Sequence, residues 1–173
     1  ACHADICLSA VGMQGNIEEL NLAKANVKSD RGFILTDKSC HTNVEGIFAI
    51  GDVAGQPLLA HKAMFEGHGV AEMLAGKAHS ELNKDQIPGC TYCHPQFASI
   101  GLTEEQCKER KLDYVVGRFP FIAIGMALAA GEEEGLVKII WGKKHGEILG
   151  AHVLSCRASD LIAEMCLVMK MEC

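Results

Sequence analysis

The sequence lacks any long apolar run and any cluster of basic residues. No apolar stretch approaches the roughly 20 residues that a helix needs to cross a bilayer. Basic residues gather no further than pairs such as Lys143-Lys144, in a chain whose formal net charge is -6. Nucleic acids and anionic membrane surfaces attract proteins through basic patches. We therefore predict neither a nucleic-acid partner nor a membrane partner.

A disorder signature and a secretion signal are missing as well. The 173 residues are 49% hydrophobic and 22% charged, which is enough to bury one or two ordinary cores. The N-terminal sequence ACHADICLSAVG lacks the basic start of a signal peptide. We expect a globular protein of the cytoplasm, or of the mitochondrial matrix if the source is eukaryotic.

The cysteines do not form the pattern of a disulfide-bonded or zinc-binding domain. Their number is odd, nine, and they are scattered among apolar residues, which is typical of free thiols. Only Cys90 and Cys93 have the spacing of a redox dithiol or of half a zinc site. His94 follows them, but no second ligand pair does, and the surrounding run is typical of a strand. We predict no metal site and no redox role for this pair.

The first part of the chain has the pattern of an α/β segment. A strand is predicted over residues 1–12, a short amphipathic turn over 17–27, and further strands in RGFILTD and IFAIGD. The last strand is apolar on both faces, as expected for a strand covered on both sides. A helix with apolar residues at helical spacing is predicted to start at His61 and to end near Gly76.

The polar tract KAHSELNKDQIPG indicates a domain boundary, with residues 1–78 before it and residues 79–173 after it. Beyond the boundary, TYCHPQFASIGL predicts one or two short strands. TEEQCKERK predicts a helix that Thr103 caps through a capping box.

The remaining segments complete an antiparallel sheet with helices. YVVGRFPF predicts a strand, and GLVKIIW and EILGAHVLS predict a β-hairpin in which His152 is a packed strand residue and not a ligand. ASDLIAEMCLVMK predicts an amphipathic helix. The predicted fold class is α+β: an antiparallel sheet flanked by helices, preceded by a partial α/β segment.

One carboxylate, Asp52, stands directly after the predicted strand IFAIG. Ligands of open α/β sheets bind outside the carboxyl ends of the strands, where a ribityl or sugar hydroxyl could donate to it. The helix that follows starts near His61, and a helix N-terminus favours negative charge, such as that of a reduced flavin. Gly-Asp is also a common turn, and His61 fits simple capping as well as a flavin contact.

The segment TNVEGIFAIGDVAGQPLLAHKAMFEG resembles the second FAD-binding segment of the flavin-dependent pyridine nucleotide–disulfide oxidoreductases. Its LAHKA continuation resembles the branch of that family that reoxidises protein-bound dihydrolipoamide with NAD, whereas other disulfide reductases usually differ after Gly-Asp. Four later segments resemble the interface domain of the same enzymes, in the same order: YCHPQFASIGLTEEQ, GRFPF, ALAAGEEEGLVKII and ILGAHVLSCRASDLIAEM.

The resemblance implies a set of cofactor-binding residues and neither a catalytic nor a metal-binding one. Asp52 would hydrogen-bond the ribityl chain of FAD. Four backbone positions at the helix start would line the flavin ring: Leu58, Leu59, Ala60 and His61. Gly12 would match a glycine that approaches the NAD cofactor, although Met13 and Gln14 stand where the family often has two arginines.

Other parts of the family pattern are not found. The sequence has no G-x-G-x-x-G loop for the FAD pyrophosphate, and Cys90 and Cys93 have the wrong position and spacing for the redox disulfide. The acid–base segment H-P-T-x-x-E is missing, since HPQF at residues 94–97 departs from it. We expect a C-terminal fragment, the end of the FAD-binding domain plus most of the interface domain, that is inactive alone and holds FAD weakly or not at all.

Two functions stay open: part of a dihydrolipoamide-oxidising enzyme, or a non-catalytic dimerisation module. A fragment of another disulfide reductase is a third possibility, which the LAHKA continuation disfavours. Because the family dimerises through the domain that residues 89–173 resemble, we expect a homodimer, and we expect residues 1–78 to be the less stable part. The parent enzyme would serve a lipoyl-bearing protein of a 2-oxo acid dehydrogenase or glycine cleavage complex.

Overall fold

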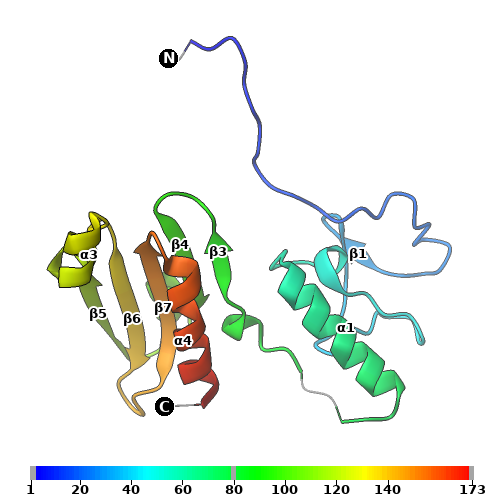
Figure 1. The fold of residues 1–173 in the computed structure, drawn as a ribbon. Coiled ribbons are helices and arrows are strands. Elements are labelled where there is room, and N and C mark those ends of the chain that lie inside the picture. Colours follow the sequence, from blue (N-terminus) through cyan, green and yellow to red (C-terminus); the bar gives the residue numbers. More distant parts are fainter. Residues whose placement is uncertain (1–2, 79–80, 172–173) are drawn as a thin grey trace. The chain divides into compact units, whose positions relative to one another are not determined.

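The computed structural model describes residues 3–78 and 81–171 and divides the chain into two compact units, Ala1–Leu82 and Asn83–Cys173 (Figure 1). The start of the strand predicted over residues 1–12 and part of the predicted boundary tract lie outside the described residues. None of the described helices is both long and apolar enough to span a membrane.

The N-terminal unit has a minimal hairpin. Strands β1 (Ser29–Asp30) and β2 (Phe33–Ile34) pair antiparallel around Arg31 and Gly32. Both turn residues have positive φ, 48° and 82°, which is the geometry that joins twisted strands through two residues. Three buried residues form the small core of the unit: Val27, Ile34 and Ala49.

One long helix dominates this unit. A 3-10 turn, η1 (Gly51–Ala54), precedes α1 (Ala60–Leu74). At the C-terminus of α1, Gly76 has φ of 68° and its N–H donates to the carbonyl of Met73 at 3.0 Å. The helix predicted between His61 and Gly76 is therefore confirmed, together with its glycine terminator.

The strand predicted over residues 1–12 is wrong for the part that the structure describes. Residues 3–12 are irregular, and the side chains of Ile6, Leu8 and Val11 are almost fully exposed. No strand pairs with this segment in the described parts of the chain. A strand without a neighbour leaves its backbone groups to water and is not stable by itself.

The strands predicted in RGFILTD and IFAIGD are largely wrong as well. Only the two residues of β2 are strand in the first, and in the second only Phe48 forms an isolated bridge, with His41. Ile47 and Ile50 are each more than a third exposed. The second segment is therefore not a strand covered on both faces, since too little sheet lies beside it to cover both.

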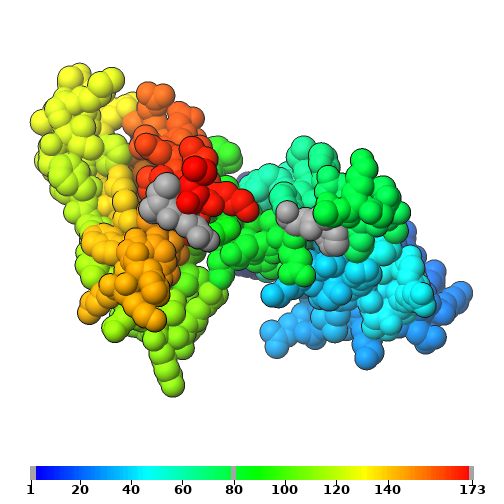
Figure 2. Space-filling view, turned by 90° about the horizontal axis from the view of Figure 1, so that it is seen from below, coloured from blue at the N-terminus to red at the C-terminus, as the bar shows by residue number. Residues whose placement is uncertain are grey.

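The C-terminal unit is built on a five-stranded antiparallel sheet of order β3-β4-β7-β6-β5. Its strands are β3 (Gly89–Thr91), β4 (Gln96–Gly101), β5 (Tyr114–Pro120), β6 (Leu136–Gly142) and β7 (Ile148–Ser155). The predicted hairpin is confirmed, because Val137 of β6 lies opposite Val153 of β7 and Lys138 lies opposite His152. The turn between β6 and β7, in orange, lies on the surface of this unit (Figure 2).

Helices of this unit begin with η2 (Lys84–Gln86) and α2 (Glu104–Glu109). The predicted capping box is present: the N–H of Gln106 donates to Thr103 Oγ1 at 3.2 Å, and the N–H of Thr103 donates to Gln106 Oε1 at 2.9 Å. The later helices are η3 (Phe121–Ala123), α3 (Gly125–Ala130) and α4 (Ala158–Met171). The sequence analysis predicted α4 and missed α3.

The two faces of the sheet carry different apolar clusters. Helix α4 covers one face (Figure 1), with Ile162 and Met169 against a row of strand residues. This cluster joins Ala98, Ile100, Ala151, Val153, Ala158, Ile162 and Met169. Val137 packs against this cluster, whereas Ile140, three residues further along β6 and so on the other face, packs with Cys107 of α2.

Candidate functional site

The candidate site is built around the turn η1, which carries Asp52. Gly51 is buried and has φ of 71°, and a Cβ placed on it would lie 3.1 Å from the Cβ of Ala63. The positive φ favours glycine at this position, and the close approach of Ala63 adds to that preference. Asp52 is exposed, and its carboxylate has no partner among the residues that the structure describes. The turn therefore presents an unpaired acceptor at the surface of the unit.

A buried ion pair on α1 holds this turn. Lys62 Nζ donates to the carbonyl oxygens of Gly51 and Gly55, each at 2.9 Å, and lies 3.3 Å from Glu66 Oε1. The other carboxylate oxygen of Glu66 accepts the N–H of Gly51 at 2.7 Å. The side chains of Lys62 and Glu66 are 0% and 7% exposed. The two residues are four positions apart and so lie on one face of α1. Through them the helix hydrogen-bonds Gly51 at the start of the turn and Gly55 just after its end.

Sequence reasoning missed Lys62 and Glu66. The prediction placed apolar residues on the buried face of α1, yet Met64 and Leu74 are each 67% exposed and the charged pair is buried. A lysine and a glutamate four residues apart are the usual mark of a solvated helix face. Only their position just after the Gly-Asp turn could have indicated another role.

The start of α1 has no side-chain cap. Leu59 is the N-cap residue, no side chain caps the helix there, and the first turn holds no acidic residue. The first N–H groups of a helix have no intrahelical acceptor, and the helix dipole favours negative charge beside them. Because Lys62 binds the carbonyl of Gly55, the turn with Asp52 and the segment from Leu58 to His61 lie next to each other.

Gly12 is not part of this arrangement in the structure. It lies in the irregular exposed segment, and nothing stands within 4 Å of a Cβ built on it. Gly15, which sequence reasoning overlooked, is in close contact instead. A Cβ on Gly15 would lie 2.7 Å from the carbonyl oxygen of Gly32 and 3.2 Å from the Cα of Val53. Gly15 therefore packs against the residue that follows Asp52.

His152 is a packed strand residue, as predicted. It is buried in β7, its ring stacks with that of Phe97 at a centroid distance of 6.4 Å, and its Nδ1 has no partner within the described residues. Desolvation lowers the pKa of His152, and the positive charge of Lys138 lowers it further. Its neutral form is therefore favoured, and nothing in its surroundings suggests a ligand.

Ionic contacts in the C-terminal unit join its elements. Glu104 of α2 lies 2.5 Å from Arg118 of β5 and 3.3 Å from Lys138 of β6. Desolvation raises the pKa of Glu104, but hydrogen bonds from Lys138 and Arg118 outweigh it and hold that pKa below its usual value. These contacts link α2 to strands β5 and β6 of the sheet.

The cysteine pair of the C-terminal unit shows no metal-binding geometry. Cys93 Sγ donates to the carbonyl oxygen of Pro95 at 3.0 Å, and Cys90 packs against the α4 cluster. Within the described residues, no group of three histidine, cysteine or acidic side chains is placed to hold a metal. Cys2 and Cys7 do have the C-x-x-x-x-C spacing, which sequence reasoning overlooked; Cys2 lies outside the described residues.

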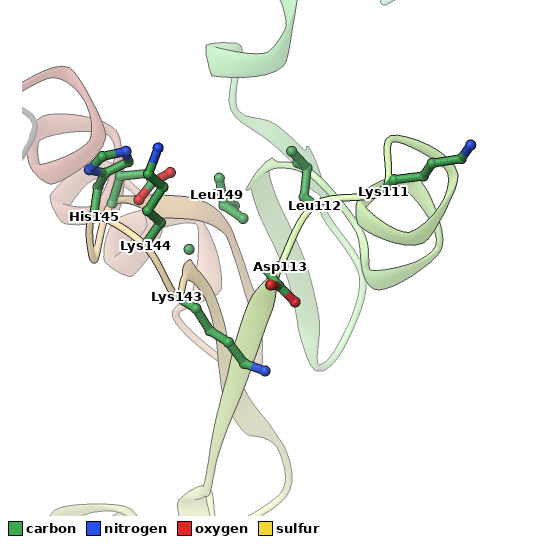
Figure 3. Close-up of a pocket in the computed structure, with 9 residues that line it drawn as sticks. Lys111, Leu112, Asp113, Lys143, Lys144, His145 and Leu149 are labelled. Atoms are coloured by element: carbon green, nitrogen blue, oxygen red, sulfur yellow. The ribbon is translucent and has the colours of Figure 1, made fainter.

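A surface hollow of about 390 Å³ lies where β5 starts and the turn between β6 and β7 begins (Figure 3). Leu112 and Leu149 are its apolar lining, and Figure 3 shows the side chains of Lys111 and Lys143 extending away from it. Charges of both signs surround it, including Asp113. The hollow therefore has no consistent charge with which to select a ligand.

Two family models match the chain. The description of the first is the dimerisation domain of the pyridine nucleotide-disulphide oxidoreductases, and it matches residues 87–173. The second is the model for pyridine nucleotide-disulphide oxidoreductase itself, and it matches residues 1–67. The two matches lie in different compact units of the structure.

Curated relatives are similar over almost all of the chain. A dihydrolipoyl dehydrogenase from Rhizobium etli is 51% identical over 170 residues, which are 98% of this chain and 35% of that protein. Another, from Zymomonas mobilis, is 46% identical over 88% of this chain and 33% of that protein. The chain thus spans about a third of the length of the curated relatives it matches.

The fold is shared with solved structures. The crystal structure of LpdA from Mycobacterium tuberculosis aligns with a TM-score of 0.83 at 22% sequence identity, over 92% of this chain and 35% of that one. At this identity the likeness concerns the fold.

Proposed function

This chain belongs to the pyridine nucleotide-disulphide oxidoreductase family, and from that premise we propose that it is part of a dihydrolipoyl dehydrogenase. The observation that carries the proposal is its 51% identity to the Rhizobium etli dihydrolipoyl dehydrogenase over 98% of its length. The whole enzyme would oxidise protein-bound dihydrolipoamide with NAD. A lipoyl-bearing protein of a 2-oxo acid dehydrogenase or glycine cleavage complex would be its substrate partner.

The proposed task of residues 1–78 is to hold the flavin end of FAD, the cofactor that would pass electrons from a dithiol to NAD. The unpaired carboxylate of Asp52 supports this, because a ribityl hydroxyl needs an accessible acceptor. The uncapped start of α1 supports it too, since its N–H groups suit the electron-rich edge of a flavin. In this proposal Leu58, Leu59, Ala60 and His61 line the ring through their backbone. Gly12 would approach NAD.

The proposed task of residues 79–173 is to join two subunits as a homodimer. The match of residues 87–173 to a dimerisation domain supports this. Apolar side chains that remain exposed on this unit also support it: Phe119, Ile122, Met126, Leu128, Leu161 and Leu167. Apolar surface that is exposed in one subunit favours association with a partner. A non-catalytic dimerisation module remains the second candidate function, and the same match favours it.

A reducing compartment fits the proposal. Of the described cysteines, Cys107 is a buried free thiol, and five others are free at more exposed positions: Cys7, Cys90, Cys93, Cys156 and Cys166. Free thiols persist in the cytoplasm and in the mitochondrial matrix, whereas oxidising compartments pair them.

A chimeric enzyme tests the proposal. This chain replaces the matched 170 residues of the Rhizobium etli dihydrolipoyl dehydrogenase, and the purified chimera is assayed for bound FAD, for dimerisation by sedimentation and for reduction of NAD by dihydrolipoamide. We expect a yellow dimer with a rate within about tenfold of the natural enzyme. A folded, dimeric chimera without flavin and without activity would contradict the enzymatic role and support the dimerisation module.

A further inference from the structure

We propose that Lys62 and Glu66 are positioning residues for the flavin: they fix the backbone from Gly51 to Gly55 so that Asp52 meets the ribityl chain. The inference rests on the proposed function, because it assigns this pair a role in the same cofactor site. Neither side chain would touch the cofactor. Both would act through the turn that carries the carboxylate.

The hydrogen-bonding capacity of the pair matches what the turn requires. An ammonium group has three N–H donors, and Lys62 directs contacts to three acceptors: the carbonyls of Gly51 and Gly55 and the carboxylate of Glu66. Glu66 uses one oxygen for Lys62 and the other for the N–H of Gly51. The two carbonyls and the amide are therefore all satisfied by two side chains from one helix.

An apolar pair could fill the same space but could not replace these contacts. Burying a backbone amide and two carbonyls without partners is costly. Both side chains are nearly inaccessible to water, where electrostatic contacts are stronger and less screened than at a surface. The pair therefore selects one conformation of the turn over the alternatives open to a sequence rich in glycine.

The orientation of Asp52 depends on this conformation. Its carboxylate has no partner in the described part of the chain, so the backbone of the turn sets the point and the Cα–Cβ direction from which the side chain extends. Lys62 also belongs to the first turn of α1, directly after the segment from Leu58 to His61. One side chain thus fixes the distance between the two elements that would contact the flavin.

The first experiment needs no cofactor. Amide hydrogen exchange of Gly51 is measured by NMR in the chain and in Glu66→Gln, with Glu72→Gln, an exposed carboxylate on the same helix, as matched control. We expect exchange at Gly51 to accelerate at least tenfold in Glu66→Gln and to stay unchanged in Glu72→Gln, with amides of the C-terminal unit as internal reference. Unchanged exchange at Gly51 in Glu66→Gln would overturn the proposal that this pair fixes the backbone of the turn.

The second experiment measures FAD affinity in the chimera with the Rhizobium etli enzyme. We expect Glu66→Gln and Lys62→Met each to weaken FAD binding at least tenfold and to alter the visible circular dichroism of the bound flavin. In a background of Asp52→Ala, the same changes should weaken binding less than twofold further, because residues that act through one another are not additive.

The outcomes distinguish the positioning role of Lys62 and Glu66 from the proposed function itself. Full additivity with Asp52→Ala, or unchanged affinity and spectrum in both single variants, would refute positioning while leaving FAD binding by the site intact. A wild-type chimera that binds no FAD would instead refute the proposed function and, with it, the flavin role of the pair. If Lys62→Met does not fold, the more conservative Glu66→Gln decides the question, since it keeps size and one hydrogen-bonding oxygen.

Discussion

The two units of the molecule differ in what fills their centres. The N-terminal unit has a small apolar core and a buried Lys62–Glu66 pair that hydrogen-bonds the backbone of a turn. The C-terminal unit has apolar clusters on both faces of a five-stranded sheet. A polar centre fixes geometry at the cost of desolvating charge, whereas an apolar centre gives stability without prescribing one contact. We infer that the polar centre of the first unit fixes the geometry of the turn that carries Asp52, whereas the apolar clusters of the second unit mainly contribute stability.

The largest effect is expected from breaking the polar centre. Lys62→Met leaves the carboxylate of Glu66 buried without its cation and removes the donor to two carbonyls, which should cost about 3–5 kcal/mol. The N-terminal unit should then be selectively destabilised while the C-terminal unit keeps its stability. Hydrogen exchange resolved by residue measures the two units separately. Lys77→Met, at an exposed position of the same unit, is the control, and equal loss of protection in both units would contradict the prediction.

A substitution in the apolar core of the C-terminal unit should destabilise that unit and leave the N-terminal unit unchanged. Ile140 of β6 is fully buried and packs with Cys107 of α2, and Ile140→Ala should destabilise the C-terminal unit by about 2–4 kcal/mol through lost contacts and a cavity. Exchange of the amides of α1 should not change. Leu167→Ala, at a position of α4 that is largely exposed, should cost far less. Comparable losses in the two variants would show that Ile140 is not central to the core.

A smaller effect is expected at the capping box. Thr103→Ala removes the side-chain acceptor for the N–H of Gln106, which should cost about 1 kcal/mol. Thr103→Ser retains the hydroxyl and should restore most of the stability. Urea unfolding of the C-terminal unit measures both variants, and identical midpoints for alanine and serine would show that the cap contributes nothing.

The smallest effect concerns an exposed ion pair. A side-chain hydrogen bond from Arg110 is the main cause that lowers the pKa of Asp85, and the two residues link η2 to α2 with contacts of 2.6 and 3.0 Å. Asp85→Asn should cost less than about 1 kcal/mol at pH 7, because water screens the pair. Since the folded pKa is lowered, this stability is present above the usual aspartate pKa of about 3.9 and disappears as the pH falls through the folded value. Urea unfolding at pH 7 and at pH 2.5 checks it: a difference between the proteins that persists at pH 2.5 would contradict the assignment.

The sequence predicted the C-terminal unit well because its signals are local. Thr103 and Gln106 are three residues apart and form the capping box that the pattern predicts. The predicted hairpin of β6 and β7 is present, and each of its strands has a neighbour on both sides. Helix α3 was missed because its six residues, GMALAA, are too few to show a helical period.

The N-terminal unit could be predicted only in part because its determinants are not local. The helix α1 has a periodic sequence, but which of its faces is buried depends on a turn that precedes it. The pair Lys62 and Glu66 is indistinguishable in sequence from a solvated pair, and Gly15 owes its role to its contact with Val53, 38 positions further along. Asp52 was found from the Gly-Asp turn and the family resemblance, whereas the residues that hold it could be found only from the fold.

The two edge strands of the five-stranded sheet, β3 and β5, influence how copies of the chain can associate. The strand at one edge, β3, has only three residues, which offers little backbone to extend a sheet. At the other edge, β5 ends in Pro120, which has no N–H to donate, and carries the charged Arg118. Short edges, prolines and charges discourage edge-to-edge growth of sheets. We therefore expect concentrated protein to resist fibrillar aggregation, and we expect contacts between copies to be made by side chains and not by a shared sheet.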